Sequence, residues 1–194
     1  MTTTWQETRA GAGRPASVIS VLLDQHVRIS ELFALVSASH GRLKQEAFDQ
    51  LRELLAVHEA GEEMVLRPVS TRILGEQAAQ ARNDEEKQAT ATLSVLEKLD
   101  VDDAEFIDQF DAFERAVTAH ADLEESEEFP RILAECGQDQ LEKMALRLVE
   151  AQSAAPSHPH PLLAGSTDAQ CLAGPFVALL DKARDAFARS SSDD

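Results

Sequence analysis

Residues 58–63 read HEAGEE and residues 120–125 read HADLEE, so a His-x-x-x-Glu-Glu motif occurs twice in the chain, 62 residues apart. Each copy is followed by a proline, Pro68 or Pro130, ten residues after its histidine. Residues four apart on a helix share one face at a spacing of about 5–6 Å, so each histidine and the glutamate of its motif can serve one metal site. The repeat therefore predicts two similar helix pairs that bring their motifs together.

Helical periodicity extends outward from both motifs. Apolar residues recur at three- and four-residue steps in four segments, 17–39, 48–66, 82–96 and 106–124. Pro68 and Gly75 are predicted to close the second helix and Pro130 to kink or end the fourth, while the Asp side chains of the turn at 100–103 suit helix capping. Aromatic residues make up only 5% of the chain and tyrosine is absent, which disfavours strands. The predicted fold is all-α, an up-down-up-down four-helix bundle with one or two additional C-terminal helices.

The rest of the chain divides by composition. Residues 1–16 are polar and are predicted to form a disordered arm, whereas 17–152 hold the bundle and a following helix. Residues 153–174 are rich in Ala, Ser, Pro and Gly and are predicted to be a linker or loop. The amphipathic segment 175–189 is expected to dock on the main body or on a second subunit, which would give a homodimer.

The first and third helices align at an offset of 60 residues. This places Asp84-Glu85-Glu86 over Asp24-Gln25-His26, so that Glu86 takes the place of His26. A lone histidine on an apolar stripe is more often a core residue with hydrogen-bond partners than a metal ligand. A single His-x-x-x-Glu pair on a helix is usually exposed to solvent. Six such residues on the inward stripes of four helices are different, because desolvated charges are costly unless a metal ion neutralises them. The predicted ligands are His26, His58, Glu62, Glu86, His120 and Glu124.

Charge and cysteine content limit the partners and the compartment. The formal net charge of −17 disfavours nucleic acid and anionic membrane surfaces as partners. The two cysteines are far apart and lie in no metal-binding spacing, which fits a reducing compartment. The sequence has no apolar stretch of signal-peptide or membrane-spanning length. We therefore expect a cytoplasmic protein.

Between about residues 17 and 135 the chain resembles the hemerythrin-like, HHE cation-binding family, which has a His on its first helix, His-x-x-x-Glu-Glu with a following Pro on the second, and then a repeat. The resemblance implies that His26, His58, Glu62, His120 and Glu124 are metal ligands. The family usually has His where this chain has Glu86, and its oxygen carriers have a further His where this chain has Thr90. Either Glu86 is a carboxylate replacement, or water, Glu85 or a neighbouring acid completes the site.

The resemblance implies a cofactor of two iron ions joined by an oxo or hydroxo bridge, with manganese or zinc as alternatives. Three glutamates would offset half the charge of two ferric ions, which favours the oxidised state over reversible oxygen transport. The expected activity is to react with or sense a small ligand such as O2, peroxide or NO, for example in protection from oxidative stress. A sensor or iron-holding module without catalysis, or a bundle that holds zinc or no metal, remains open.

Three acidic neighbours of the motifs have weaker predictions. Glu63 and Glu125 each follow a ligand glutamate and are expected to face solvent or to accept a hydrogen bond from a ligand histidine. Glu59 directly follows His58 and is a reserve ligand.

Overall fold

The structure is a computed structural model that describes residues 17–154 and 176–190. The predicted arm at 1–16 and nearly all of the predicted linker at 153–174 lie outside the described residues. Helices and two π turns account for the regular structure of the described parts, which confirms the all-α class. In chain order these are α2 (Val18–Ala38), α3 (Gly41–Gly61), η1 (Glu62–Leu66), α4 (Arg67–Leu74), α5 (Glu76–Leu96), α6 (Ala104–Leu123), η2 (Glu124–Glu128), α7 (Phe129–Glu135), α8 (Gln138–Ala154) and α10 (Phe176–Ser190).

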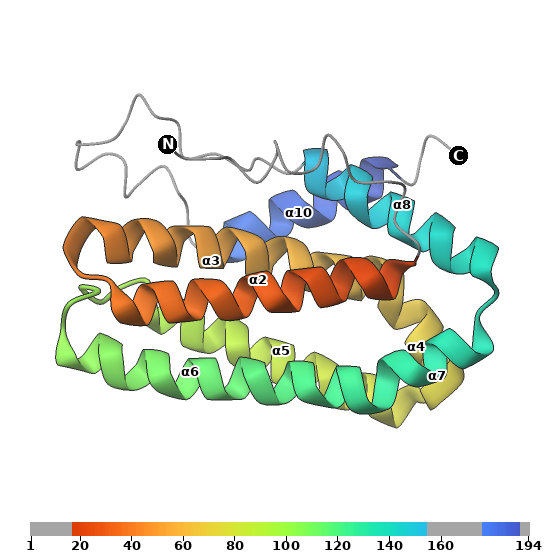
Figure 1. Cartoon of the computed structure of the whole chain (residues 1–194), viewed down its shortest axis with the longest axis horizontal. Coiled ribbons are helices and arrows are strands. Elements are labelled where there is room, and N and C mark those ends of the chain that lie inside the picture. Colours follow the sequence, from red (N-terminus) through yellow and green to blue (C-terminus); the bar gives the residue numbers. More distant parts are fainter. Residues whose placement is uncertain (1–16, 155–175, 191–194) are drawn as a thin grey trace.

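The helices α2, α3, α5 and α6 lie alongside one another and form the predicted four-helix bundle (Figure 1). The two additional helices, α8 and α10, pack on its outside, where α10 contacts α3 and α8 contacts α2. Within 17–154 and 176–190, no helix combines the length and hydrophobicity that a membrane span requires.

The N-terminus of helix α3 is capped by a residue from the turn between α5 and α6. The carboxylate of Asp102 accepts the backbone N–H of Gly41 at 2.9 and 3.1 Å, and Gly41 has a φ of +55° that favours glycine. Asp103 occupies the N-cap position of α6, but its side chain makes no capping hydrogen bond. The acidic turn therefore caps α3 through Asp102, a role that the local sequence did not reveal.

The core is divided along the bundle axis. At the end of the bundle that carries the turn between α2 and α3, aromatic rings fill the space between the helices. The ring centroids of Phe33 and Phe110 are 5.3 Å apart, and those of Phe48 and Phe106 are 5.1 Å apart. The other half of the interior contains the buried histidines and glutamates. The cluster of buried histidines and carboxylates therefore lies in the half of the bundle near α4 and α7.

A π turn follows each His-x-x-x-Glu motif. The N–H of Arg67 bonds to the carbonyl of Glu62, and the N–H of Phe129 bonds to the carbonyl of Glu124, in each case five residues back. Pro68 and Pro130 come next and cannot donate to the carbonyl four residues earlier, so the preceding turn widens. The helix then continues to Leu74 or Glu135. The prediction that Pro68 helps to close the second helix was therefore wrong, because the π turn absorbs the proline.

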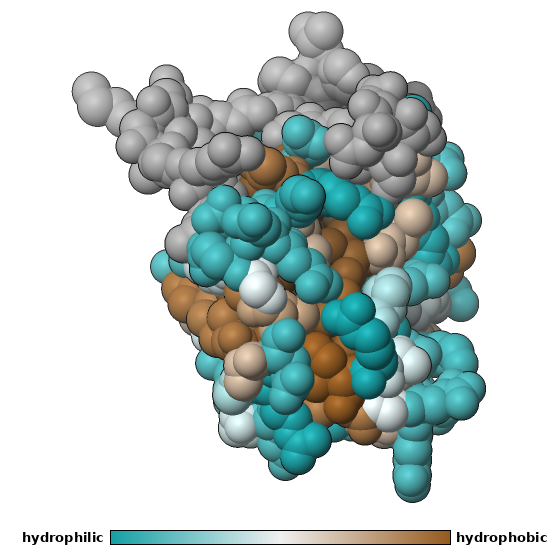
Figure 2. Space-filling view, turned by 90° about the vertical axis from the view of Figure 1, so that its right-hand side faces the viewer, coloured by the Kyte–Doolittle hydropathy of each residue, from teal (hydrophilic) through white to brown (hydrophobic). Residues whose placement is uncertain are grey.

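The chain changes direction after each π turn, so α4 and α7 lie at an angle to α3 and α6 (Figure 1). The end of the molecule that carries α4, α7 and α8 shows a narrow strip of hydrophobic residues between hydrophilic flanks (Figure 2). The two π turns thus lie where the bundle bends, next to the polar half of its core.

Helices α8 and α10 meet α3 at Gly61. A Cβ atom at Gly61 would overlap Leu148 Cδ1 and would lie 3.2 Å from Phe187 Cζ. Nearby, the Arg184 guanidinium of α10 pairs with the Glu63 carboxylate at 2.7 Å. The additional helices therefore rest directly against the segment that presents Glu62.

Candidate metal centre

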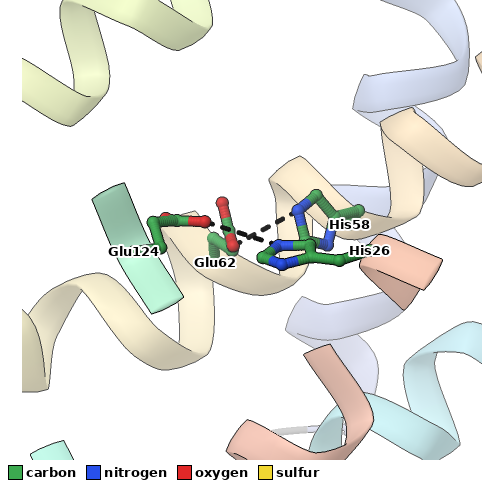
Figure 3. A group of neighbouring side chains, drawn as sticks. All are labelled: His26, His58, Glu62 and Glu124. Atoms are coloured by element: carbon green, nitrogen blue, oxygen red, sulfur yellow. Dashed lines mark ion pairs between the residues drawn. The ribbon is translucent and has the colours of Figure 1, made fainter. Parts of the chain in front are cut away.

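Four predicted ligands form one cluster, to which α2, α3 and the two π turns contribute (Figure 3). His26, His58, Glu62 and Glu124 each offer one donor atom, and these atoms lie within 4.8 Å of one another. His58 Nε2 is 3.3 Å from Glu62 Oε1, and His26 Nε2 is 3.5 Å from Glu124 Oε2. We call this cluster the first position.

A second cluster shares a glutamate with the first. Glu62, Glu86 and His120 offer donor atoms that also lie within 4.8 Å of one another. His120 Nε2 is 3.8 Å from Glu62 Oε2 and 3.4 Å from Glu124 Oε1. We call this cluster the second position. Glu62 and Glu124 thus each direct one oxygen toward each position, as carboxylates that bridge two metal ions do.

The two bridging carboxylates test whether cations fit. Glu62 and Glu124 are fully buried, and in the described part of the chain none of their four carboxylate oxygens accepts a hydrogen bond. His26 Nε2 is buried without a hydrogen-bond partner as well. Burial of two carboxylates carries a desolvation cost that a bound cation can offset. Oxygen and imidazole donors suit iron, manganese or zinc.

Each histidine is oriented by an acceptor on its other ring nitrogen. His26 Nδ1 lies 2.8 Å from Glu125 Oε1, and His120 Nδ1 lies 2.8 Å from Glu85 Oε2. His58 Nδ1 lies 2.8 Å from Gln25 Oε1. With Nδ1–H donating to these oxygens, Nε2 of each ring is left as the atom available to a metal.

The repeat contains the signal for these acceptors, which residue-by-residue reasoning missed. Gln25 and Glu85 occupy equivalent places at the offset of 60 residues, and each accepts from the motif histidine of the following helix. Glu125 is one of the predicted acceptors, whereas Glu63 pairs with Arg184. In the repeat Glu63 is the counterpart of Glu125, but the counterpart of His26 is Glu86, which has no ring nitrogen to orient.

Glu86 faces two partners. It belongs to the second position, and its Oε1 also accepts from the guanidinium of Arg67, the first residue after η1. Burial raises the pKa of Glu86 to about 7, although Arg67 lowers it. The alternative ligand Glu85 lies on the Nδ1 side of His120, away from Nε2. Arg67 was missed because an ideal α-helix would direct it away from the face of Glu62.

Without a metal ion, the imidazoles carry the balancing charge. Burial alone would lower the pKa of His120, but the Glu124 and Glu62 carboxylates raise it to about 12. Burial would raise the pKa of Glu124, yet His120 and His26 lower it to about 2. Burial lowers the pKa of His58 to about 4. His58 is therefore neutral at pH 7 and has a free Nε2 lone pair.

The reserve ligand Glu59 points elsewhere. Its Oε2 accepts from the Thr90 hydroxyl at 3.5 Å, and it belongs to neither cluster. Burial, together with the Glu86 and Glu62 carboxylates, raises the pKa of Glu59 to about 8. Glu59 is thus a buried carboxyl group that holds its proton at neutral pH.

A cavity of about 580 Å³ reaches the site between α2, α5 and α6. Its walls include the apolar side chains of Phe33, Phe113 and Val117, and its polar side is formed by residues that include His26 and His120. A cavity with apolar walls and a few converging polar groups is typical of a small-molecule site.

Comparison with known proteins points to a cation-binding domain. Residues 17–132 match the sequence model of the Hemerythrin HHE cation binding domain. An uncharacterized hemerythrin-like protein of Schizosaccharomyces pombe is 27% identical over 134 residues, an alignment that covers 68% of this chain and 66% of the relative. The chain thus spans just under two thirds of that relative's length.

A solved structure also resembles the chain. It is the crystal structure of a Hemerythrin HHE cation binding domain-containing protein from Mycobacterium kansasii, with a TM-score of 0.65 and 21% sequence identity. The match covers 91% of this chain and 99% of that one. At this identity the likeness concerns the fold.

Proposed function

Because the chain belongs to the hemerythrin HHE cation-binding domain family, we propose that it holds two iron ions in the bundle and reacts with or senses O2, peroxide or NO. The observation that carries the proposal is the pair of buried carboxylates, Glu62 and Glu124. Each directs one oxygen toward the histidines of the first position and the other toward His120. Iron ions held by these two glutamates and the three histidines would offset the buried carboxylate charge.

The donor set supports reaction or sensing rather than reversible oxygen transport. Three histidines and up to three glutamates form a harder site than a histidine-rich one, and hard donors favour the ferric state. An iron pair in such a site supplies redox chemistry toward small oxygen or nitrogen oxide species. The protein orients the histidines through Gln25, Glu85 and Glu125, and the cavity beside the site accommodates a small ligand.

A second candidate function is sensing through the C-terminal helices. Gly61 and Glu63 flank Glu62, and both contact α10, through Phe187 and Arg184 respectively. A change in the position of Glu62 on metal or gas binding would therefore be transmitted to α10. This function needs no turnover, and the two candidates make different predictions.

The first experiment is a metal analysis. Protein purified without oxygen from iron-supplemented cells is expected to contain about two irons per chain and to change its visible absorption spectrum on exposure to O2, peroxide or NO. A His120→Ala variant should lose iron, whereas His40→Ala, which removes an exposed histidine outside both positions, should retain it. A chain that acquires no iron under these conditions would refute the proposal, and manganese or zinc in its place would refute the choice of iron.

The second experiment separates enzyme from sensor. An enzyme should turn over peroxide in a manner that His120→Ala abolishes and Arg184→Gln leaves intact, since Arg184 lies on the surface of α10. A sensor should show no turnover. It should instead show a change in hydrogen exchange of α10 on ligand binding, and Arg184→Gln should weaken that change.

A further inference from the structure

Arg67 is a buried cation inside the candidate metal centre. The π turn Glu62–Leu66 brings it back toward the side of Glu62, and only 6% of the residue is exposed. Its guanidinium pairs with Glu86 and lies 3.8 Å from Glu128 Oε1. Glu128 belongs to the other π turn, so the two repeat-related distortions bring this arginine and this glutamate together.

The two metal positions differ in their relation to Arg67. In the first position, the oxygen donors Glu62 and Glu124 have no hydrogen-bond partner in the described residues. In the second position, Glu86 is already engaged by the guanidinium. An arginine side chain stays charged at every accessible pH, so a metal ion at the second position must separate this pair or lie beside a like charge.

We propose that the two positions fill in sequence and with unequal affinity, because Arg67 competes with the second ion for Glu86. This inference rests on the proposed two-metal function. The first ion binds at His26 and His58 without displacing Arg67 from Glu86. The second ion binds when Glu86 leaves the guanidinium.

Glu128 is an alternative ion-pair partner for Arg67. It is buried with only 4% of its surface exposed, and its Oε1 atom has no hydrogen-bond partner in the described residues. The 3.8 Å from Arg67 NH1 to this oxygen is short enough for a side-chain adjustment to make a full ion pair. Arg67 therefore has two arrangements, paired with Glu86 when the second position is empty and paired with Glu128 when it is filled.

Titration of metal-free protein with Mn2+ tests the inference, with free Mn2+ counted by its electron paramagnetic resonance signal. The native chain should bind one ion per chain tightly and a second at least tenfold more weakly. Arg67→Gln should tighten the second event about tenfold and leave the first within twofold, while Glu86→Gln should abolish the second event. Arg52→Gln removes another buried arginine, one that pairs with Glu97 away from the site, and should change neither event.

Further variants separate competition from general charge effects and keep the test valid if Arg67→Gln does not fold. Glu128→Gln removes the alternative partner and should weaken the second event at least threefold, whereas Glu127→Gln, an exposed neighbour, should not. Arg67→Lys keeps the positive charge and should keep the second event weak. A second event that is unchanged or weaker in Arg67→Gln, or unchanged in Glu128→Gln, would overturn the inference and leave the two-metal function standing. A native chain that binds no Mn2+ and no iron would overturn both.

Discussion

Replacement of Gly61 by valine should weaken the packing of the C-terminal helices against the bundle. Leu148 and Phe187, the side chains next to a Cβ at this position, are both fully buried, so they have little room to move. Overpacking of this kind costs about 1–3 kcal/mol. Better helix propensity of valine over glycine returns only about 0.3 kcal/mol. We expect a net loss of about 2 kcal/mol, which corresponds to a fall in Tm of about 4–8 °C for a chain of this size.

Differential scanning calorimetry measures the effect, and hydrogen exchange locates it in α8 and α10. Gly137→Ala is the matched control, since a Cβ there meets nothing within 4 Å, and its Tm should stay within about 2 °C of the native value. Adding Leu148→Ala to the valine variant should cost less than the sum of the single changes, because the new cavity accommodates the valine. A valine variant as stable as the native protein would refute the assigned close contact between α3 and these helices.

Four further predictions concern the site and its supports. Chelation of bound metal should lower the free energy of unfolding at pH 7. The loss should be about 2.7 kcal/mol where free metal had been present at 100 times its Kd. An unchanged Tm would argue against a structural role for the ions. Glu85→Ala should weaken metal binding about 10–100-fold because it frees the His120 ring, and Glu85→Gln, which keeps an acceptor oxygen, should weaken it less. Burial and the Asp49 carboxylate raise the pKa of Glu53 to about 7. Between about pH 4.5 and 7 the native chain therefore binds more protons than the unfolded chain, and its stability falls as the pH rises through that range. The Tm advantage of Glu53→Gln should therefore grow from pH 5 to pH 8, and a constant difference would count against this assignment. Asp102→Ala removes the cap on Gly41 and should cost about 1 kcal/mol in urea denaturation, with no effect on metal content.

The sequence allowed much of this architecture to be predicted because helical periodicity and the repeated motif are both visible in the order of the residues. A stripe of apolar residues defines the inward face of a helix, and one face defines which side chains meet in a bundle. The offset between His58 and His120 therefore predicted that the motif residues and His26 would come together. The presence of Glu86 in the place of His26 was also visible from the internal repeat alone.

The contribution of Arg67 and Glu128 could not be predicted in the same way. On an ideal α-helix Arg67 would point away from the face of Glu62, and only the π turn returns it to that side. Glu128 lies four residues after Glu124 and so shares its face, but nothing in the local sequence indicates that it meets Arg67 from the other helix pair. The signal was the proline ten residues after each histidine; Pro68 was interpreted as helping to end its helix, and Pro130 as kinking or ending its own. A proline can be accommodated either by ending a helix or by widening the turn before it, and tertiary packing decides between the two.

In the described parts of the chain the outer helices pack mainly on α2 and α3, so the two sides of the bundle differ. With α8 and α10 against α2 and α3, the cavity lies on the other flank, among α2, α5 and α6. The side chains of His120 and Glu86 are each 15% exposed, against 6% for His26 and His58. The second position is thus the more solvent-accessible one, and it is also the one where Arg67 competes with a metal ion for Glu86. The first position is thus the more buried of the two and suits long residence of a metal ion. The second position is more open to the solvent and suits exchange of ions or small ligands.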